Sequence, residues 1–262
     1  MSRAPLFAAA LGAALLLAGP ALAQSVSLDL GQAGQPGATA RLVQLTALIA
    51  LLSLAPSLLV MVTAFARITI VLSLLRSAIG AANVPPNPVL IGLSLFLTFF
   101  VMQPVVERAW EDGIQPMVEG RIGEMEGLER SAEPFRAFMA ANVRDGDLAL
   151  FLDLAGLAPP GGTSGDISGE APGKTPARAA GAPWRALVPA FMVSELRRGF
   201  EIGFLVFLPF LVIDLVVASL LMSLGMMMLP PSAVSLPFKI IFFVMVDGWR
   251  LISESLVQGF AN

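Results

Sequence analysis

The 262-residue sequence contains no cysteine, no histidine and no tyrosine. Without cysteine the chain has no disulfide, no thiol nucleophile and no thiolate metal ligand. Without histidine it lacks the usual general base and the commonest zinc ligand, and a Ser-His-Asp triad is excluded. These absences argue against an enzyme. We predict no catalytic, cofactor-binding or metal site, and no pattern in the sequence is typical of a nucleic-acid-binding protein.

Charge is also scarce, because Asp, Glu, Lys and Arg make up only 13% of the residues. Hydrophobic residues make up 56%, and the mean hydropathy is +0.80. An ordinary soluble domain has about 25% charged residues, so this composition indicates a polytopic membrane protein.

The N-terminus has the layout of a cleavable secretory signal peptide over residues 1–23. Arg3 precedes the apolar run Ala4 to Gly19, and Ala21-Leu22-Ala23 forms a small-residue cleavage site. The alternative is an uncleaved first anchor, but the run is short for a span of about 20 residues. Residues 24–41, rich in Gly and Gln, predict a flexible outer arm.

Four apolar segments predict an all-α membrane protein in which the helices form two hairpins, one over residues 42–106 and one over residues 186–262. The predicted spans are 42–66, 89–106, 202–229 and 240–257. Between the hairpins, residues 107–185 are rich in acidic side chains and predict a partly helical extracytoplasmic, periplasmic insert, with a Gly/Pro-rich linker at 159–183. Four spans after a signal peptide place both mature termini outside, and the positive-inside rule agrees weakly.

A faint internal repeat relates the two hairpins. In the first, Ser73-Leu74-Leu75 leads to Gly80 and then to Pro85-Pro86; in the second, Ser219-Leu220-Leu221 leads to Gly225 and then to Pro230-Pro231. Double prolines cannot continue a helix, so Pro85, Pro86, Pro230 and Pro231 predict hairpin turns. One interpretation is two related hairpins with both turns on the cytoplasmic side, and the other is coincidence in Leu/Ser-rich sequence.

Several charges fall inside apolar segments. Each costs roughly 2.5 to 3.5 kcal/mol at the centre of a span, so these side chains should face protein or water. Asp214 and Lys239 are open to three interpretations: an ion pair within one hairpin, a contact to another subunit, or groups facing a wet channel. The remaining charges singled out for assembly or export are Arg67 and Asp247. The pair Asp214 and Asp247 lacks the sequence context of an intramembrane aspartyl protease.

Two further groups of residues lie before and at the end of the predicted span 202–229. Glu195 and Arg197 predict a charged collar that anchors the chain at an interface or contacts another subunit. Met226, Met227 and Met228 lie at a helix end, just before a double proline. Methionine is flexible and polarizable, so such a run can seal a lumen around objects of different shape, although ordinary hydrophobic packing also explains it.

The apolar segments resemble the FliP family of flagellar type III export-gate membrane proteins. The matching stretches are LSLAPSLLVMVTAFARITIVLSLLRSAIG (Leu52 to Gly80), PPNPVLIGLSLFLTFFVMQPV (Pro85 to Val105), FLPFLVIDLVVASLLMSLGMMMLPP (Phe207 to Pro231) and LPFKIIFFVMVDGW (Leu236 to Trp249). Together they cover nearly all of the apolar sequence. The stretch 159–183 looks longer than is typical of the family.

The resemblance implies a subunit of an oligomeric conical helical assembly. Members form a homopentamer that joins FliQ and FliR and associates with FlhB and FlhA at the flagellar basal body in the bacterial inner membrane. The run Met226 to Met228 matches the family's methionine-rich gasket, which limits leakage while unfolded flagellar export substrates pass. Two rival interpretations stay open: an injectisome export-gate subunit for virulence effectors, and a stand-alone secondary transporter suggested by the repeat and the midplane charges.

Overall fold

The computed structural model describes residues 43, 45–47, 49–50, 53–54, 57, 60–81, 84–157, 181–226 and 228–260. The chain divides into two compact units, Met1–Leu54 and Ala55–Asn262. The described residues of the first unit, which begin at 43, are helical. The predicted signal peptide and outer arm, most of the first predicted span and most of the linker lie outside the described residues.

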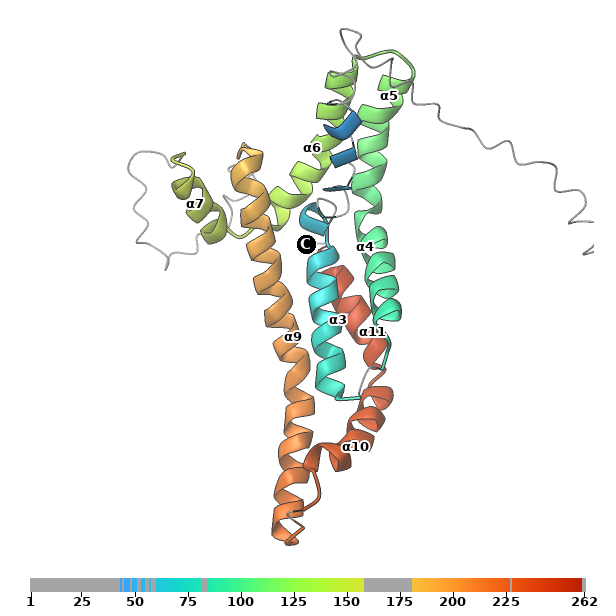
Figure 1. The fold of residues 1–262 in the computed structure, drawn as a ribbon, viewed down its shortest axis with the longest axis vertical. Helices are drawn as coiled ribbons and strands as arrows, with labels where there is room; N and C mark the ends of the chain where they lie inside the picture. Colours follow the sequence, from blue (N-terminus) through green and yellow to red (C-terminus); the bar gives the residue numbers. More distant parts are fainter. Residues whose placement is uncertain are drawn as a thin grey trace, which may run out of the picture. The chain divides into compact units, whose positions relative to one another are not determined.

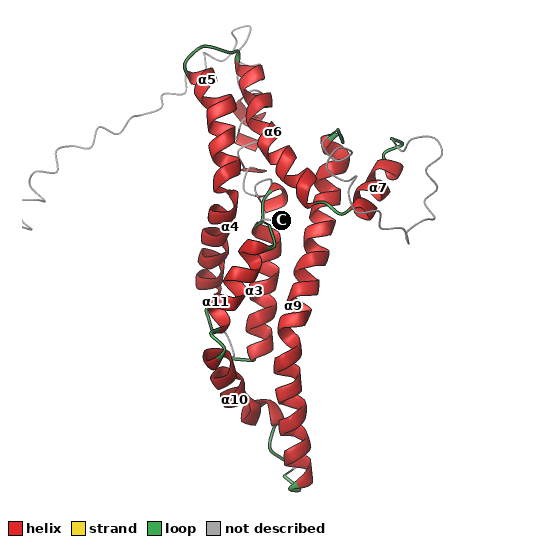
Figure 2. Ribbon diagram, turned by 180° about the vertical axis from the view of Figure 1, so that it is seen from behind, coloured by secondary structure: helices red, strands yellow, loops and turns green. Residues whose placement is uncertain are grey.

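The second unit is built from helices, as predicted, and its described residues contain no strand (Figures 1 and 2). The helices are α3 (Phe65–Ile79), α4 (Asn87–Ala109), the π-helical turn η1 (Trp110–Ile114), α5 (Gln115–Val118), α6 (Glu124–Asn142), α7 (Asp145–Leu154), α9 (Trp184–Ser223), α10 (Pro231–Met245) and α11 (Gly248–Gln258).

Helix α3 is the central element of the larger buried core of this unit. In Figure 1 it lies between α9 and α4, with α11 beside it. Apolar side chains at helical spacing, such as Ile68, Leu72 and Leu75, are at most 1% exposed. They pack in one cluster with Leu97 of α4 and Leu256 of α11. The sequence of α3 is apolar on nearly every face because other helices surround it.

Two glycines let α9 approach α3 closely. A Cβ atom at Gly199 would lie 3.3 Å from the Cβ of Ile70, and one at Gly203 would lie 3.1 Å from the Cβ of Leu74. Glycines four residues apart lie on one face of a helix, and this small-xxx-small spacing is common where membrane helices pack tightly.

The second predicted span, 89–106, lies within α4, but the helix does not stop where the predicted insert begins at residue 107. It continues through η1 and α5, so that Asn87–Val118 forms one helical run of 32 residues. A tight contact with α6 fixes its far end. A Cβ atom at Gly113 would lie 2.5 Å from the backbone nitrogen of Ser131 and 2.6 Å from the carbonyl oxygen of Gly127.

The first part of the insert is helical, as the sequence predicts. Within α7 the segment Leu148 to Leu154 presents an apolar face, since Leu148 and Leu152 are buried while Leu150 and Leu154 are exposed. The buried leucines join a second apolar cluster with Phe191 of α9. The insert therefore packs onto the beginning of α9 through side chains that alternate at helical spacing.

In both copies of the sequence repeat a helix ends at a left-handed glycine and a new helix begins after a proline. Helix α3 ends at Gly80, which has φ 77°, and α9 ends next to Gly225, which has φ 72°. Glycine is favoured in this left-handed region because it has no Cβ. The next helix starts directly after Pro86 in the first copy and after Pro230 in the second. Both turns lie toward the lower end of Figure 1.

The predicted fourth span, 240–257, is not one helix. Helix α10 ends at Met245, and Asp247 adopts a left-handed conformation with φ 51° and ψ 52° before α11 begins at Gly248. Aspartate tolerates this conformation better than most residues. A Cβ atom at position 248 would overlap the ring of Phe243, so this corner favours glycine. The Asp-Gly dipeptide is a turn signal that hydropathy alone does not detect.

Among the described residues, two helical runs are long and apolar enough to cross a membrane, Asn87–Val118 and Trp184–Ser223. In the most apolar 18-residue stretch of each run, only 28% and 17% of the residues, respectively, are buried inside the chain. With 40 residues, α9 is about 60 Å long, roughly twice the hydrocarbon thickness of a bilayer. Much of the apolar surface therefore needs a cover other than this chain.

Candidate functional site

Asp214 and Lys239 form an ion pair between α9 and α10. Lys239 Nζ donates a hydrogen bond to Asp214 Oδ2 at 2.6 Å, and Ser235 Oγ donates to Asp214 Oδ1 at 2.6 Å. The side chain of Lys239 is 7% exposed and that of Asp214 is 34% exposed. The two charges thus form the ion pair that is one of the three interpretations of the sequence, and the aspartate keeps one accessible side. Contact of that side with another subunit or with a wet channel stays a prediction.

The same lysine also links α10 to α3. Lys239 Nζ also donates to the carbonyl oxygen of Ala78 at 3.0 Å. Ala78 belongs to the last turn of α3, where carbonyl groups have no partner within the helix and where the helix dipole favours a cation. A hydrogen bond to a charged group contributes about 1.5–3 kcal/mol, so Lys239 is a polar link between the end of α3 and α10.

Arg67 forms a second buried ion pair, with Glu195 of α9. The guanidinium Nε donates to Glu195 Oε2 at 2.8 Å, and Nη2 donates to Oε1. The two side chains are 1% and 0% exposed. Two parallel bonds of this kind give the pair a fixed geometry.

Arg67 also holds the end of α11. Its Nη1 donates to the carbonyl oxygen of Gly259 at 3.0 Å, and its guanidinium carbon lies 3.6 Å from the centre of the Phe260 ring. Phe260 stacks on Phe138 of α6 at 5.8 Å between ring centres. One arginine therefore connects α3, α9 and the C-terminal turn, a set of partners that its sequence context does not indicate.

The predicted collar divides into an interior and a surface part. Glu195 lies inside the chain, whereas the Arg197 side chain is 56% exposed and its Nη1 lies 3.9 Å from Asp147 Oδ1. Asp147 is buried and accepts a hydrogen bond from Ser194 Oγ at 2.8 Å. Nearby, Arg144 forms a two-bond ion pair with Glu201. These groups fix α7 on α9. The intersubunit role of Glu195 and Arg197 stays a prediction.

The methionine run follows the end of α9. Met226 is 45% exposed and lines a recess with Leu221 and Met222, whereas Met228 is 98% exposed. Met227 lies outside the described residues. The two described methionines thus differ in their surroundings, although the sequence alone treats them as equivalent.

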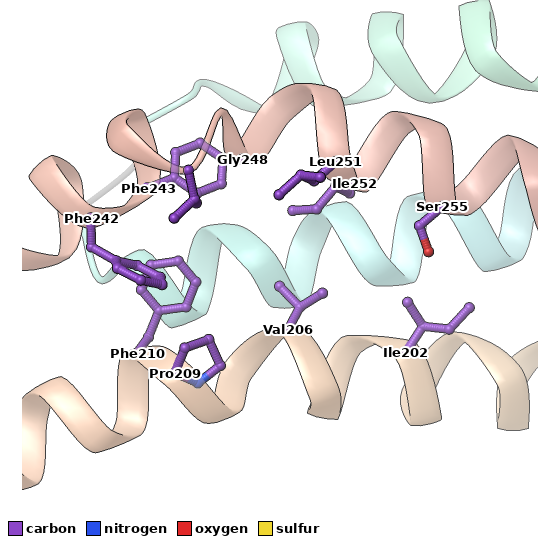
Figure 3. A pocket seen from close by; sticks show the side chains of 11 residues that line it. Ile202, Val206, Pro209, Phe210, Phe242, Phe243, Gly248, Leu251, Ile252 and Ser255 are labelled. Carbon is purple, nitrogen blue, oxygen red and sulfur yellow. The ribbon is translucent and has the colours of Figure 1, made fainter.

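An open apolar groove of about 240 Å³ lies between α9, α10 and α11 (Figure 3). Figure 3 shows Ile202, Val206 and Pro209 of α9 facing Phe243 and Ile252 across it. Asp247 lies beside the groove at the corner between α10 and α11 and is exposed. Among the described residues no cluster of three metal-ligating side chains occurs.

In the described residues, long apolar helices with exposed faces and ion pairs inside the chain are the features of a helical membrane protein. The chain belongs to the FliP family, whose sequence model matches residues 48–256.

Similar proteins carry the same family name. A protein of Rhizobium meliloti (strain 1021) named "Flagellar biosynthetic protein FliP" is 47% identical over 97% of this chain and 98% of its own length. Proteins of the same name from Caulobacter vibrioides and Bacillus subtilis (strain 168) are 50% and 43% identical. They cover 96% and 89% of this chain, and 88% and 98% of their own lengths.

Proposed function

We propose that this chain is a core channel subunit of the flagellar type III export gate and that it conducts unfolded flagellar proteins across the bacterial inner membrane. Membership of the FliP family is the single observation that carries the proposal. Relatives that match nearly the whole chain are named for flagellar biosynthesis. The proposed role is passive conduction, and other components of the apparatus would supply the energy.

The exposed apolar faces support a role within an assembly. Large side chains along α4 and α9, such as Phe96, Phe99, Phe204 and Leu205, are each at least 60% exposed. We infer that further copies, in a homopentamer, together with FliQ, FliR, FlhB, FlhA and membrane lipid, cover these faces. The periplasmic placement of both mature termini is part of the same proposal.

The exposed methionine at the end of α9 supports the gasket role. Met228 is almost fully exposed, and only Leu229 and Pro230 separate it from the start of α10. A side chain there can project from the surface of the chain. Flexible thioether side chains adapt to irregular surfaces, which suits a seal that yields to passing chains.

Replacing Met226, Met227 and Met228 with alanine tests the proposal. We expect the assembled complex to form in normal amount and its ion conductance in planar bilayers to rise, because the seal loses bulk. The matched control is Met125→Ala in α6, a methionine that is 71% exposed and lies outside the run. Unchanged conductance of assembled triple-variant complexes would remove the gasket assignment.

The two rivals are less well supported. An injectisome subunit would share the architecture, but the relatives described above are named for flagella. A stand-alone transporter needs a polar solute site that works in a single chain. In the described part of the molecule the midplane charges Asp214 and Lys239 bind each other and Ala78 instead.

A further inference from the structure

The way in which α9 ends fixes the position of the first methionine of the run. Gly225 has φ 72°, and its N–H donates to the carbonyl oxygen of Met222 at 3.1 Å. The N–H of Met226 donates to the carbonyl oxygen of Leu221 at 2.9 Å. These two bonds around a left-handed glycine are the Schellman motif, which satisfies helix carbonyls that otherwise lack partners.

The motif also determines which side chain lies against the end of α9. A hydrophobic contact between the residue after the glycine and the residue five positions earlier frequently accompanies it. Here these residues are Met226 and Leu221, and both line an apolar recess of about 300 Å³. The other lining residues are Ala218, Met222, Leu229 and Pro231. Met228 lies beyond this recess and is 98% exposed.

We propose that the methionines of the run have different tasks: Met226 seats the loop in the recess, and Met228 is the side chain that the seated loop presents. Gly225 and Met226 are then positioning residues, acting through Met228. This inference rests on the proposed gate function, because it assigns separate roles to two methionines of the same site. It further requires that an apolar side chain of similar size can replace Met226.

The chain contains a matched control for the glycine. At the end of α5, Gly120 has φ 70°, its N–H donates to the Met117 carbonyl at 3.1 Å, and the Arg121 N–H donates to the Pro116 carbonyl at 2.9 Å. A Cβ atom at Gly120 or at Gly225 would have no neighbouring heavy atom within 4 Å. Alanine at either position therefore introduces the same backbone strain without a steric clash.

The test compares single variants in the complete membrane complex, purified from cells in which the variant is the sole copy. The variants are Gly225→Ala, Gly225→Asn, Gly120→Ala, Met226→Ala, Met226→Leu and Met228→Ala. Native gels measure the amount of assembled complex, and planar bilayers measure its ion conductance. Alanine in the left-handed region changes the equilibrium between the observed loop conformation and its alternatives by about tenfold, toward the alternatives. Asparagine tolerates the left-handed region.

We expect Gly225→Ala and Met226→Ala to raise the conductance several-fold, toward the value of Met228→Ala. Gly225→Asn, Met226→Leu and Gly120→Ala should stay at the wild-type value, and all variants should assemble. If Gly225→Ala yields no complex, the conductances of Met226→Ala and Met226→Leu are compared instead, and their difference tests whether Met226 seats the loop. Equal conductance in those two variants would overturn the inference, as would wild-type conductance in both alanine variants of positions 225 and 226. Wild-type conductance of Met228→Ala beside raised conductance of the triple alanine variant would also overturn the inference. Wild-type conductance of the triple variant itself would instead remove the gasket assignment on which the inference rests.

Discussion

At the scale of single residues, one buried and one partly buried ion pair hold the helices together. Arg67 and Glu195 are separated by 128 positions, and Asp214 and Lys239 by 25. The shorter separation lies within one hairpin, so the sequence already suggests that pair. Nothing in the sequence around Arg67 indicates which face of α9 it meets, because the partner depends on how α3 and α9 cross.

Removing one partner of the pair between Arg67 and Glu195 should destabilise the protein by about 3–5 kcal/mol, because the other charge stays buried and unpaired. The variants are Arg67→Met, Glu195→Met and the double variant, and thermal unfolding in detergent measures stability. We expect the double variant to be more stable than either single variant. A double variant whose loss equals the sum of the two single losses would contradict this coupling.

Neutralising the other pair should affect assembly or export. Lys239→Met removes the bonds to Asp214 and to Ala78, and Asp214→Asn removes the charge that Lys239 faces. We expect fewer assembled complexes and reduced swimming in both variants, with a loss of about 1.5–3 kcal/mol per charged hydrogen bond. The control is Glu126→Gln, which breaks an exposed pair with Arg130 worth about 0–1 kcal/mol. Full motility in both variants of the buried pair would refute this role.

At the scale of helices, hydropathy predicts apolar segments well but not where helices end. The first half of the insert is helical as predicted, and both proline turns begin new helices. The fourth predicted span breaks at Asp247, since a left-handed residue and the close contact of Gly248 with Phe243 interrupt it. A sliding average of hydropathy contains no information about such a corner.

Two glycines of the run Asn87–Val118 should respond differently to alanine. At Gly113 a Cβ would lie 2.6 Å from the Gly127 carbonyl oxygen, whereas at Gly92 no heavy atom lies within 4 Å. Overpacking against backbone costs about 1–3 kcal/mol, while alanine in an open helix position gains up to about 1 kcal/mol. Thermal unfolding should therefore show Gly113→Ala destabilised and Gly92→Ala unchanged or stabilised. Equal stability of the two variants would show that α6 does not pack against η1 in this way.

At the scale of the whole molecule, the chain buries its charges and leaves much of its apolar surface uncovered. The 40-residue helix α9 is longer than a bilayer is thick, and only 17% of its most apolar window is buried. Such a surface suits a subunit that completes its packing with other chains and with lipid. Resemblance to the family predicts such a subunit, whereas the residues of one chain do not specify which partners cover its surface or how many copies assemble.

The most direct measurement is swimming motility and hook-protein export in a deletion strain of the bacterium that encodes this chain, with the wild-type gene supplied back as the control. A core subunit of the flagellar export gate predicts that the deletion abolishes both, because no unfolded flagellar protein can leave the cytoplasm, and that the supplied gene restores both. Normal swimming and hook export in the deletion strain would contradict the flagellar role and favour an export gate that serves other substrates.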